Sequence, residues 1–130
     1  MNKRALLIED NEQNRYLATF LLERHGYKVF SAIDGQKGLA LAQELTVDVI
    51  LLDIQLPTMD GYAVAEALRN ISSLRTTPII AVTSYAMVGD KERCLASGCN
   101  GYIEKPINPE TFVSEIEYFL PSESTSKVDQ

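Results

Sequence analysis

A chain of 130 residues has the size of one domain with a full hydrophobic core. Its net charge of −6 argues against binding to nucleic acid, because a phosphate backbone would be repelled. The N-terminal residues form neither a signal peptide nor a membrane span, so we expect no membrane insertion.

The two cysteines, Cys94 and Cys99, are too few for a disulfide framework. Their spacing, with His25 as the only histidine, matches no metal-binding motif. We therefore expect both thiols to be reduced and structural, in a cytoplasmic protein, and a redox role stays an open alternative.

The first half of the chain alternates short apolar runs with helical patterns. Asn11 is a suitable N-cap for the first helix, Gly26 marks its end, and Gly35 opens the second helix. Leu17, Phe20 and Leu21 follow helical spacing within the first helix. The expected elements are a strand at 5–8, a helix at 12–25, a strand at 28–32, a helix at 35–45 and a strand at 49–53.

The second half continues the alternation. Gly98 stops one helix, and Pro121 ends the last one. The expected elements are a helix at 62–71, a polar linker at 72–77, a strand at 78–82, a helix at 88–97, a strand at 101–104 and a helix that begins at Asn108 or Thr111. Residues 122–130 have no apolar periodicity, so we predict a domain of residues 1–121 followed by a disordered tail.

Five strands that alternate with five helices predict an α/β fold with a doubly wound parallel sheet of the flavodoxin-like type. Right-handed crossovers and short connections favour the strand order 2-1-3-4-5. In this order the first and third strands are neighbours, and the carboxyl ends of all strands lie at one edge of the sheet.

The segment of residues 47–61 is the centre of this arrangement. Its unbroken apolar run at 49–52 is typical of a strand covered on both faces, and the run ends on Asp53. Ligands of open α/β sheets bind beside the carboxyl ends of the strands, where Asp53 is expected. A structural alternative is that Asp53 caps the following helix or pairs with a lysine.

The predicted sheet brings Asp53 together with Glu9 and Asp10, which end the first strand. Three carboxylates in one pocket repel one another unless a cation lies among them, and carboxylate ligands suit Mg²⁺. Thr83 and Lys105 arrive from the fourth and fifth strands. A carboxylate, a metal, a lysine and a hydroxyl together indicate phosphoryl transfer to aspartate. An ion pair with Asp53 is the alternative role for Lys105.

Four short motifs follow strands in this pattern: residues 8–11 (IEDN), 52–61 (LDIQLPTMDG), 81–84 (AVTS) and 101–106 (GYIEKP). Each motif is weakly specific alone, but all four in this order are strongly specific. From Lys3 to about Leu120, the chain resembles the receiver domains of response regulators in two-component signalling.

The resemblance implies a role for each acidic residue. Asp53 is the phosphoacceptor and takes its phosphoryl group from a histidine kinase or a histidine phosphotransfer protein. Asp10, Asp53 and the backbone carbonyl of Gln55 bind Mg²⁺, and Glu9 assists through water. Many relatives have aspartate at the position of Glu9, so we rank Asp10 above Glu9 as a direct ligand. The protein is then a signalling phosphoacceptor that assists its own phosphorylation and dephosphorylation, and not an enzyme.

The resemblance also implies how the signal leaves the site. Thr83 and Lys105 contact the phosphoryl group, and Tyr102 turns inward when Thr83 moves. An ordinary amphipathic tyrosine at a strand edge is the alternative for Tyr102. A protein partner would then read the face formed by the fourth helix, fifth strand and fifth helix. The resemblance further implies a cis bond between Lys105 and Pro106.

Three other functions stay open. A phosphatase with an aspartyl nucleophile would carry a second carboxylate two residues after Asp53, where this chain has Gln55. A nucleotide-binding flavodoxin-like protein would carry a phosphate loop after the first strand, where this chain is acidic. A degenerate receiver would lack a site residue, and none is missing.

The chain is expected to be a stand-alone regulator, with a receiver domain excised from a hybrid histidine kinase as the alternative. Gln55 and Tyr85 flank the site and are expected to tune the loss of phosphate.

Overall fold

The computed structural model describes residues 3–56, 59–84 and 89–121. The strands β1 (Lys3–Ile8), β2 (Tyr27–Ala32), β3 (Val49–Asp53), β4 (Ile79–Thr83) and β5 (Gly101–Glu104) form one parallel sheet. Their order is β2-β1-β3-β4-β5, which confirms the predicted doubly wound fold. The predicted tail at 122–130 lies outside the described residues.

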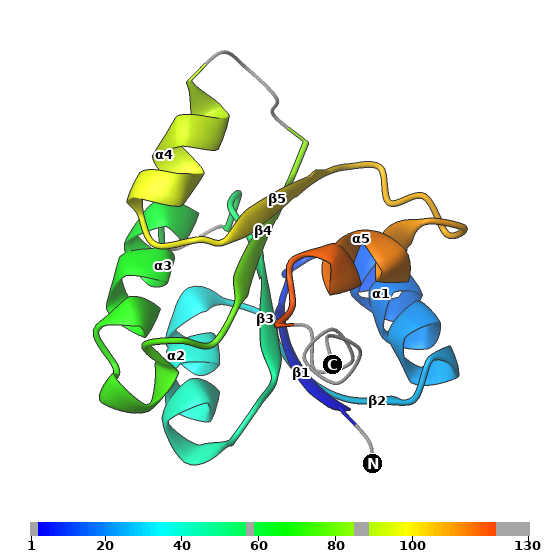
Figure 1. The fold of residues 1–130 in the computed structure, drawn as a ribbon, viewed down its shortest axis with the longest axis horizontal. Helices are drawn as coiled ribbons and strands as arrows, with labels where there is room; N and C mark the ends of the chain where they lie inside the picture. The colour runs from blue at the N-terminus through cyan, green and yellow to red at the C-terminus, as the bar shows by residue number, and fades with distance from the viewer. Residues whose placement is uncertain (1–2, 57–58, 85–88, 122–130) are drawn as a thin grey trace, which may run out of the picture.

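Helices cover both faces of the sheet (Figure 1). One face carries α2 (Gly35–Glu44), α3 (Gly61–Arg69) and α4 (Asp90–Ala96), and the other carries α1 (Glu12–Arg24) and α5 (Phe112–Tyr118). None of the described helices is long and apolar enough to cross a membrane.

The central strand β3 supplies both cores because successive side chains of a strand point to opposite faces. Ile50 and Leu52 pack with the helices α2, α3 and α4, whereas Val49 and Leu51 pack with α1 and α5. All five residues of β3 are buried, including the terminal Asp53. The apolar run seen in the sequence is therefore what holds a carboxylate inside the protein.

Most helix ends follow the predicted signals. The Asn11 side chain accepts a hydrogen bond from the Asn14 amide at 2.8 Å, and Gly26 and Gly98 have left-handed φ values of 88° and 109° after α1 and α4. Helix α5 ends at Tyr118, before Pro121, because its last carbonyls already bond to the amides of the residues that follow. The predicted start of the fourth helix at Val88 lies outside the described residues.

The prediction of a polar linker at 72–77 was incomplete, because this segment contains a 3₁₀ turn (Ser72–Leu74) with a buried leucine, Leu74. Arg69 holds the segment in place. Its guanidinium donates hydrogen bonds to the carbonyls of Leu74 at 2.6 Å, Thr77 at 2.8 Å and Gly98 at 2.6 Å. One side chain thus joins the end of α3 to the end of α4.

Helical spacing alone did not identify the buried face of α1. The buried residues are Ala18, Leu21 and Leu22, whereas Phe20 is 45% exposed. Phe20 stacks on Tyr16 and lies under the guanidinium of Arg24, 5.6 Å from its ring centroid. Partial cover by neighbours on its own helix lets this phenylalanine stay outside the core.

Candidate functional site

The register of the sheet brings the polar strand ends together. Ile8 pairs with Leu52, so Glu9 follows β1 at the level where Asp53 ends β3. Asp53 in turn pairs with Val82, and Thr83 pairs with Glu104 at the end of β5. Because all strands are parallel, residues that lie far apart in the sequence share one edge.

Four of the predicted residues form one compact charged cluster, the acidic site, made of Glu9, Asp10, Asp53 and Lys105. One oxygen from each of the three carboxylates lies within 4.8 Å of the others. The Lys105 ammonium lies 3.0 Å from Glu9 Oε1 and 3.4 Å from Asp53 Oδ2. The ion pair considered as an alternative for Lys105 is therefore present in this structure.

Asp53 is held in an environment that disfavours its charge. The pKa of Asp53 is raised from 3.8 to about 7, chiefly by burial and also by the neighbouring Glu9. The backbone amide of Gln55, which donates to Asp53 Oδ1 at 2.9 Å, and the charge of Lys105 act in the opposite sense. The single ammonium of Lys105 does not compensate for burial beside other carboxylates.

The carboxylate of Asp10 is the member of the acidic site most open to a new ligand. Both oxygens of Glu9 are engaged, Oε1 by Lys105 and Oε2 by the Asn11 amide at 3.1 Å. Asp10 is exposed, and within the described part of the chain its carboxylate has no hydrogen bond or ion pair. Three clustered carboxylate oxygens with excess negative charge suit a hard divalent cation.

Thr83 and Gln55 lie beside this cluster. Thr83 is buried at the end of β4, and its carbonyl accepts a hydrogen bond from the Lys105 amide at 2.8 Å. The Gln55 side chain reaches across to the next loop, where its Oε1 accepts from the Ser84 amide at 3.2 Å. The structure therefore ties the β3–α3 loop to the end of β4 through a side-chain contact that sequence reasoning missed. Tyr85, the other predicted flanking residue, lies outside the described residues.

Tyr102 stands apart from the acidic site, in the middle of β5. It is partly buried, and its pKa is raised by burial and then by the charges of Glu104, Cys94 and Asp90. Tyr102 packs against the core cluster that includes Cys94 of α4, so its ring lies on the side of β5 that faces this helix. A shift of α4 would therefore change the surroundings of the Tyr102 ring.

Two backbone features shape the rim of the site. The bond between Lys105 and Pro106 is cis, as the resemblance implied. A Cβ atom on Gly61 would lie 2.4 Å from the Ile54 Cα, so only glycine lets α3 begin this close to the residue after Asp53. Asp60 caps the same helix by accepting from the Tyr62 amide at 3.1 Å. The N-cap of α3 is therefore Asp60 and not Asp53, whose carboxylate belongs to the acidic site.

Comparison with known proteins decides the family. The model of the response regulator receiver domain matches residues 5–117. The chain belongs to the response regulator receiver family. The receiver is 42% identical over 120 residues to the polar-differentiation response regulator DivK of Brucella ovis, and the match covers 92% of this chain and 98% of DivK.

Two solved receiver structures resemble this one over their whole length. The chemotaxis protein CheY4 of Vibrio cholerae is 32% identical, with a TM-score of 0.89, over 92% of this chain and 100% of that one. The receiver domain of the sensor histidine kinase PA1611 of Pseudomonas aeruginosa is 34% identical, with a TM-score of 0.85, over 94% and 100%. That domain was solved with a magnesium ion coordinated in its active-site cleft.

The raised pKa of Asp53 predicts that the metal-free receiver loses stability as the pH rises. A carboxyl group whose pKa is higher in the folded state, about 7 against an ordinary 3.8, favours folding while it is protonated. This contribution is fully present below the ordinary value and disappears as the pH passes about 7, at about 1.4 kcal/mol for each pKa unit.

We expect urea unfolding in EDTA to show a falling free energy of unfolding from pH 5 to pH 8, and Asp53→Asn to be more stable than the wild type at pH 8. The difference between the two proteins should shrink toward pH 5, since the wild-type carboxyl group is then protonated. Parallel pH profiles for both proteins would contradict the assigned cause.

Proposed function

We propose that this receiver takes a phosphoryl group onto Asp53 from a phosphohistidine, in the presence of Mg²⁺, and passes the signal on through a protein partner. The observation that supports this most directly is the buried Asp53 carboxylate, clustered with Glu9, Asp10 and Lys105 at the end of β3. The donor is a histidine kinase or a histidine phosphotransfer protein.

The chemistry follows from the contacts of Asp53. One carboxylate oxygen attacks the phosphorus, an oxygen–phosphorus bond forms, and the bond between phosphorus and the histidine nitrogen breaks. The Gln55 amide fixes the rotation of the carboxylate at 2.9 Å, and the Lys105 ammonium offers a positive charge to a phosphoryl oxygen. When bound by Asp10, Asp53 and the Gln55 carbonyl, Mg²⁺ would supply further charge neutralisation. The magnesium ion of the Pseudomonas receiver supports this choice of metal.

We place the protein among signalling phosphoacceptors and not among turnover enzymes. An aspartyl phosphatase would need an acid–base carboxylate two residues after the nucleophile, and Gln55 stands there with its side chain bonded to the Ser84 amide. A nucleotide-binding protein would need free amides after β1, but the Glu9 carboxylate already accepts from the Asn11 amide. A degenerate receiver would lack Asp53, Lys105 or Asp10.

The cellular setting is proposed on related grounds. Both cysteines are free thiols, which suits a cytoplasmic protein, and the net charge of −6 speaks against nucleic acid as a partner. The match to nearly the whole of DivK and CheY4 supports a stand-alone regulator. The equally complete match to a receiver from a sensor histidine kinase supports the alternative of an excised domain.

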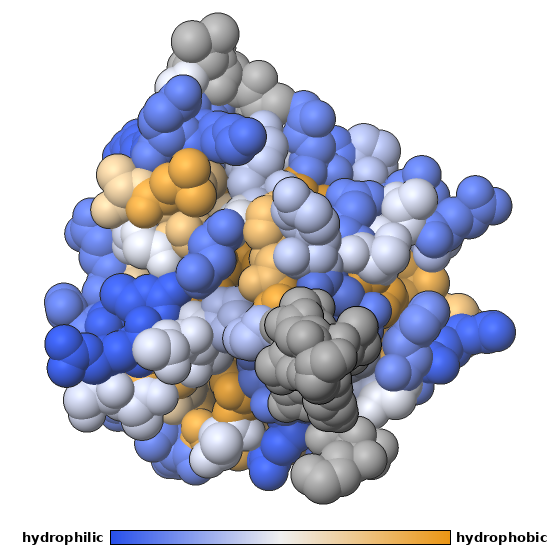
Figure 2. All heavy atoms as spheres, viewed as in Figure 1, coloured by the Kyte–Doolittle hydropathy of each residue, from blue (hydrophilic) through white to orange (hydrophobic). Residues whose placement is uncertain are grey.

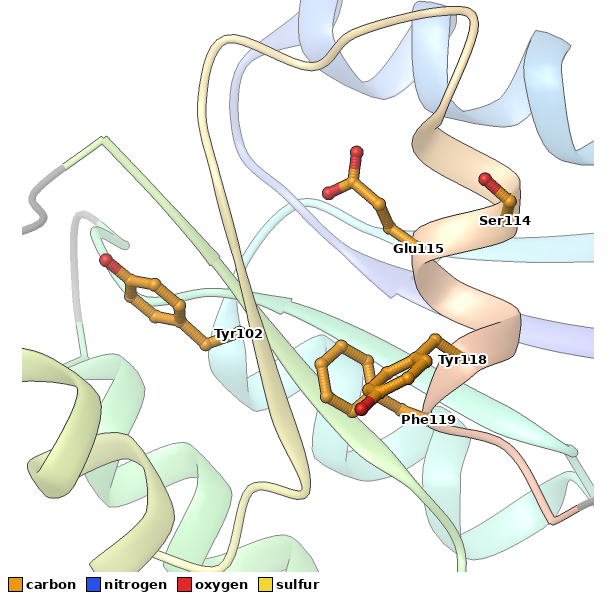
Figure 3. Close-up of a pocket in the computed structure, with 5 residues that line it drawn as sticks. All are labelled: Tyr102, Ser114, Glu115, Tyr118 and Phe119. Carbon is orange, nitrogen blue, oxygen red and sulfur yellow. The ribbon is translucent and has the colours of Figure 1, made fainter.

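We propose that the signal leaves through the output face, defined here as α4, β5 and α5. The Lys105 amide bonds to the Thr83 carbonyl, so a phosphoryl group that draws Thr83 and Lys105 inward would pull on the ends of both β4 and β5. Tyr102 lies on β5, before the end of that strand, and packs on the side of the sheet that α4 covers. In Figure 3 its ring points away from the α5 side chains, toward the side of the sheet that α4 covers.

The surface of the output face suits a protein partner. A shallow pocket of about 340 Å³ lies between β5 and α5, lined by Tyr102, Ser114, Glu115, Tyr118 and Phe119 (Figure 3). Tyr118 is 82% exposed and Leu95 of α4 is 47% exposed. Figure 2 shows apolar surface on α4 and between α4 and α5, surrounded by hydrophilic side chains. Exposed apolar and aromatic groups with a polar rim are typical of protein interfaces.

The phosphoacceptor assignment predicts that acetyl phosphate and Mg²⁺ add one phosphoryl group, located on Asp53 by peptide mass spectrometry after borohydride reduction. Asp53→Asn should not be labelled, and EDTA should abolish labelling of the wild type, because the carboxylates repel the donor without a cation. Asp60→Asn is the matched control, since asparagine also caps α3. Stoichiometric labelling of Asp53→Asn, or labelling unaffected by EDTA, would refute the assignment.

The metal site predicts a ranking of its two acidic neighbours. We expect Asp10→Ala to weaken Mg²⁺ binding more than Glu9→Ala, because Glu9 is already engaged by Lys105 and the Asn11 amide. Isothermal titration calorimetry with Mg²⁺ measures both affinities. Equal losses, or a larger loss for Glu9→Ala, would contradict the ranking.

The output face predicts that beryllofluoride with Mg²⁺ changes the amide chemical shifts of α4, β5 and α5. The differential contacts to the phosphoryl group must bias a pre-existing equilibrium, and couplings of about 1–3 kcal/mol are typical. Asp53→Asn is the control that should not respond. Shift changes confined to the neighbours of the acidic site, with residues 89–104 unaffected, would mean that this face is no switch.

A further inference from the structure

Arg15 of α1 binds the backbone of the loop that carries two acids of the site. Its Nη1 donates to the carbonyl of Glu9 at 3.0 Å and to the carbonyl of Asp10 at 3.3 Å. Arg15 is partly buried, one turn into α1. The guanidinium therefore bridges consecutive carbonyls directly after β1.

This loop needs an external restraint. Successive side chains of an extended chain point to opposite sides, yet oxygens of Glu9 and Asp10 both approach Asp53 within 4.8 Å. The backbone must turn after Glu9, and the turn brings like charges together. Glu9 is fixed by Lys105 and the Asn11 amide, but within the described residues nothing binds the Asp10 carboxylate. The position of Asp10 depends on its backbone, and Arg15 is the side chain that holds that backbone.

We propose that Arg15 is a positioning residue for the divalent metal site: it fixes the Glu9 and Asp10 carbonyls so that the Asp10 carboxylate faces Asp53 before the ion binds. The proposal rests on the proposed function, because it assumes that the acidic site binds Mg²⁺. A site arranged in advance avoids the cost of ordering the loop during binding. Groups that orient metal ligands typically contribute about 10–100-fold to metal affinity.

A purely electrostatic role for Arg15 predicts the opposite result. A guanidinium close to the site repels a divalent cation, so removing its charge should by itself strengthen Mg²⁺ binding. Removing a positioning residue should weaken binding, because Asp10 is then free to turn toward water. The sign of the change therefore separates the two roles.

The experiment is a Mg²⁺ titration by calorimetry of the full chain and its Arg15→Met variant. We expect the affinity to fall by about tenfold. Arg24→Met is the matched control: it removes the same charge from the same helix, at an arginine that stacks on Phe20, and should leave the affinity within about twofold of the wild type. Thermal unfolding in EDTA checks that each variant is folded, and Arg15→Ala, which also removes the donor, serves if Arg15→Met is not.

Each outcome bears on a distinct claim. An unchanged or tighter Mg²⁺ affinity in the folded Arg15 variant overturns the positioning role, and so does an equal loss in Arg24→Met. If the wild type binds Mg²⁺ and Asp10→Ala loses binding while the Arg15 variant does not, only the inference about Arg15 fails. If the wild type does not bind Mg²⁺, the proposed metal site fails together with the inference.

Discussion

The buried negative charge of Asp53 is the constraint on which the rest of the structure depends. β3 has apolar cores on both faces, so the carboxylate at its end is only 3% exposed. A charged group in such a place needs partners, and Lys105, which lies within 3.4 Å, offers one positive charge to two neighbouring acids. The acidic site therefore has more negative charge from its carboxylates than the single ammonium of Lys105 can balance.

This imbalance has a chemical use. Burial and the neighbouring Glu9 raise the pKa of Asp53 to about 7, which costs the metal-free fold stability at neutral pH. In the proposed function, a divalent cation would relieve the repulsion, and a phosphoryl group would offer oxygens to Lys105 and Thr83. The free energy of unfolding that this repulsion costs the metal-free protein would then be recovered when the ion and the phosphoryl group bind.

The surroundings connect this site to the surface by short links. Gln55 joins the loop after Asp53 to the Ser84 amide, and the Lys105 amide joins β5 to the Thr83 carbonyl. Helix α4 is attached to α3 through Arg93, whose guanidinium lies 4.1 Å above the Tyr62 ring. At the far end of α4, Arg69 binds the Gly98 carbonyl. Helix α4 is thus held at Arg93 and again just beyond its C-terminal end.

The sequence by itself determined the alternation of strands and helices, the order of the sheet and the cluster of Glu9, Asp10, Asp53 and Lys105. These follow from apolar periodicity and from the rule that parallel strands end at one edge, which need no side-chain detail. The exposure of Phe20 was not predictable, because neighbours decide which of several apolar residues is buried. The early end of α5 was not predictable either, because hydrogen bonds within its last turn, and not Pro121, end the helix.

Only the tertiary structure decided the roles of Arg15, Arg69 and Gln55. Each of them binds main-chain groups: Arg15 the carbonyls after β1, Arg69 the carbonyls of Leu74, Thr77 and Gly98, and Gln55 the Ser84 amide. Every residue has a main-chain carbonyl, and all but proline have an amide, so a sequence carries no sign of which of them a side chain will reach. Which main-chain groups these three side chains reach depends on distances that exist only in the folded structure.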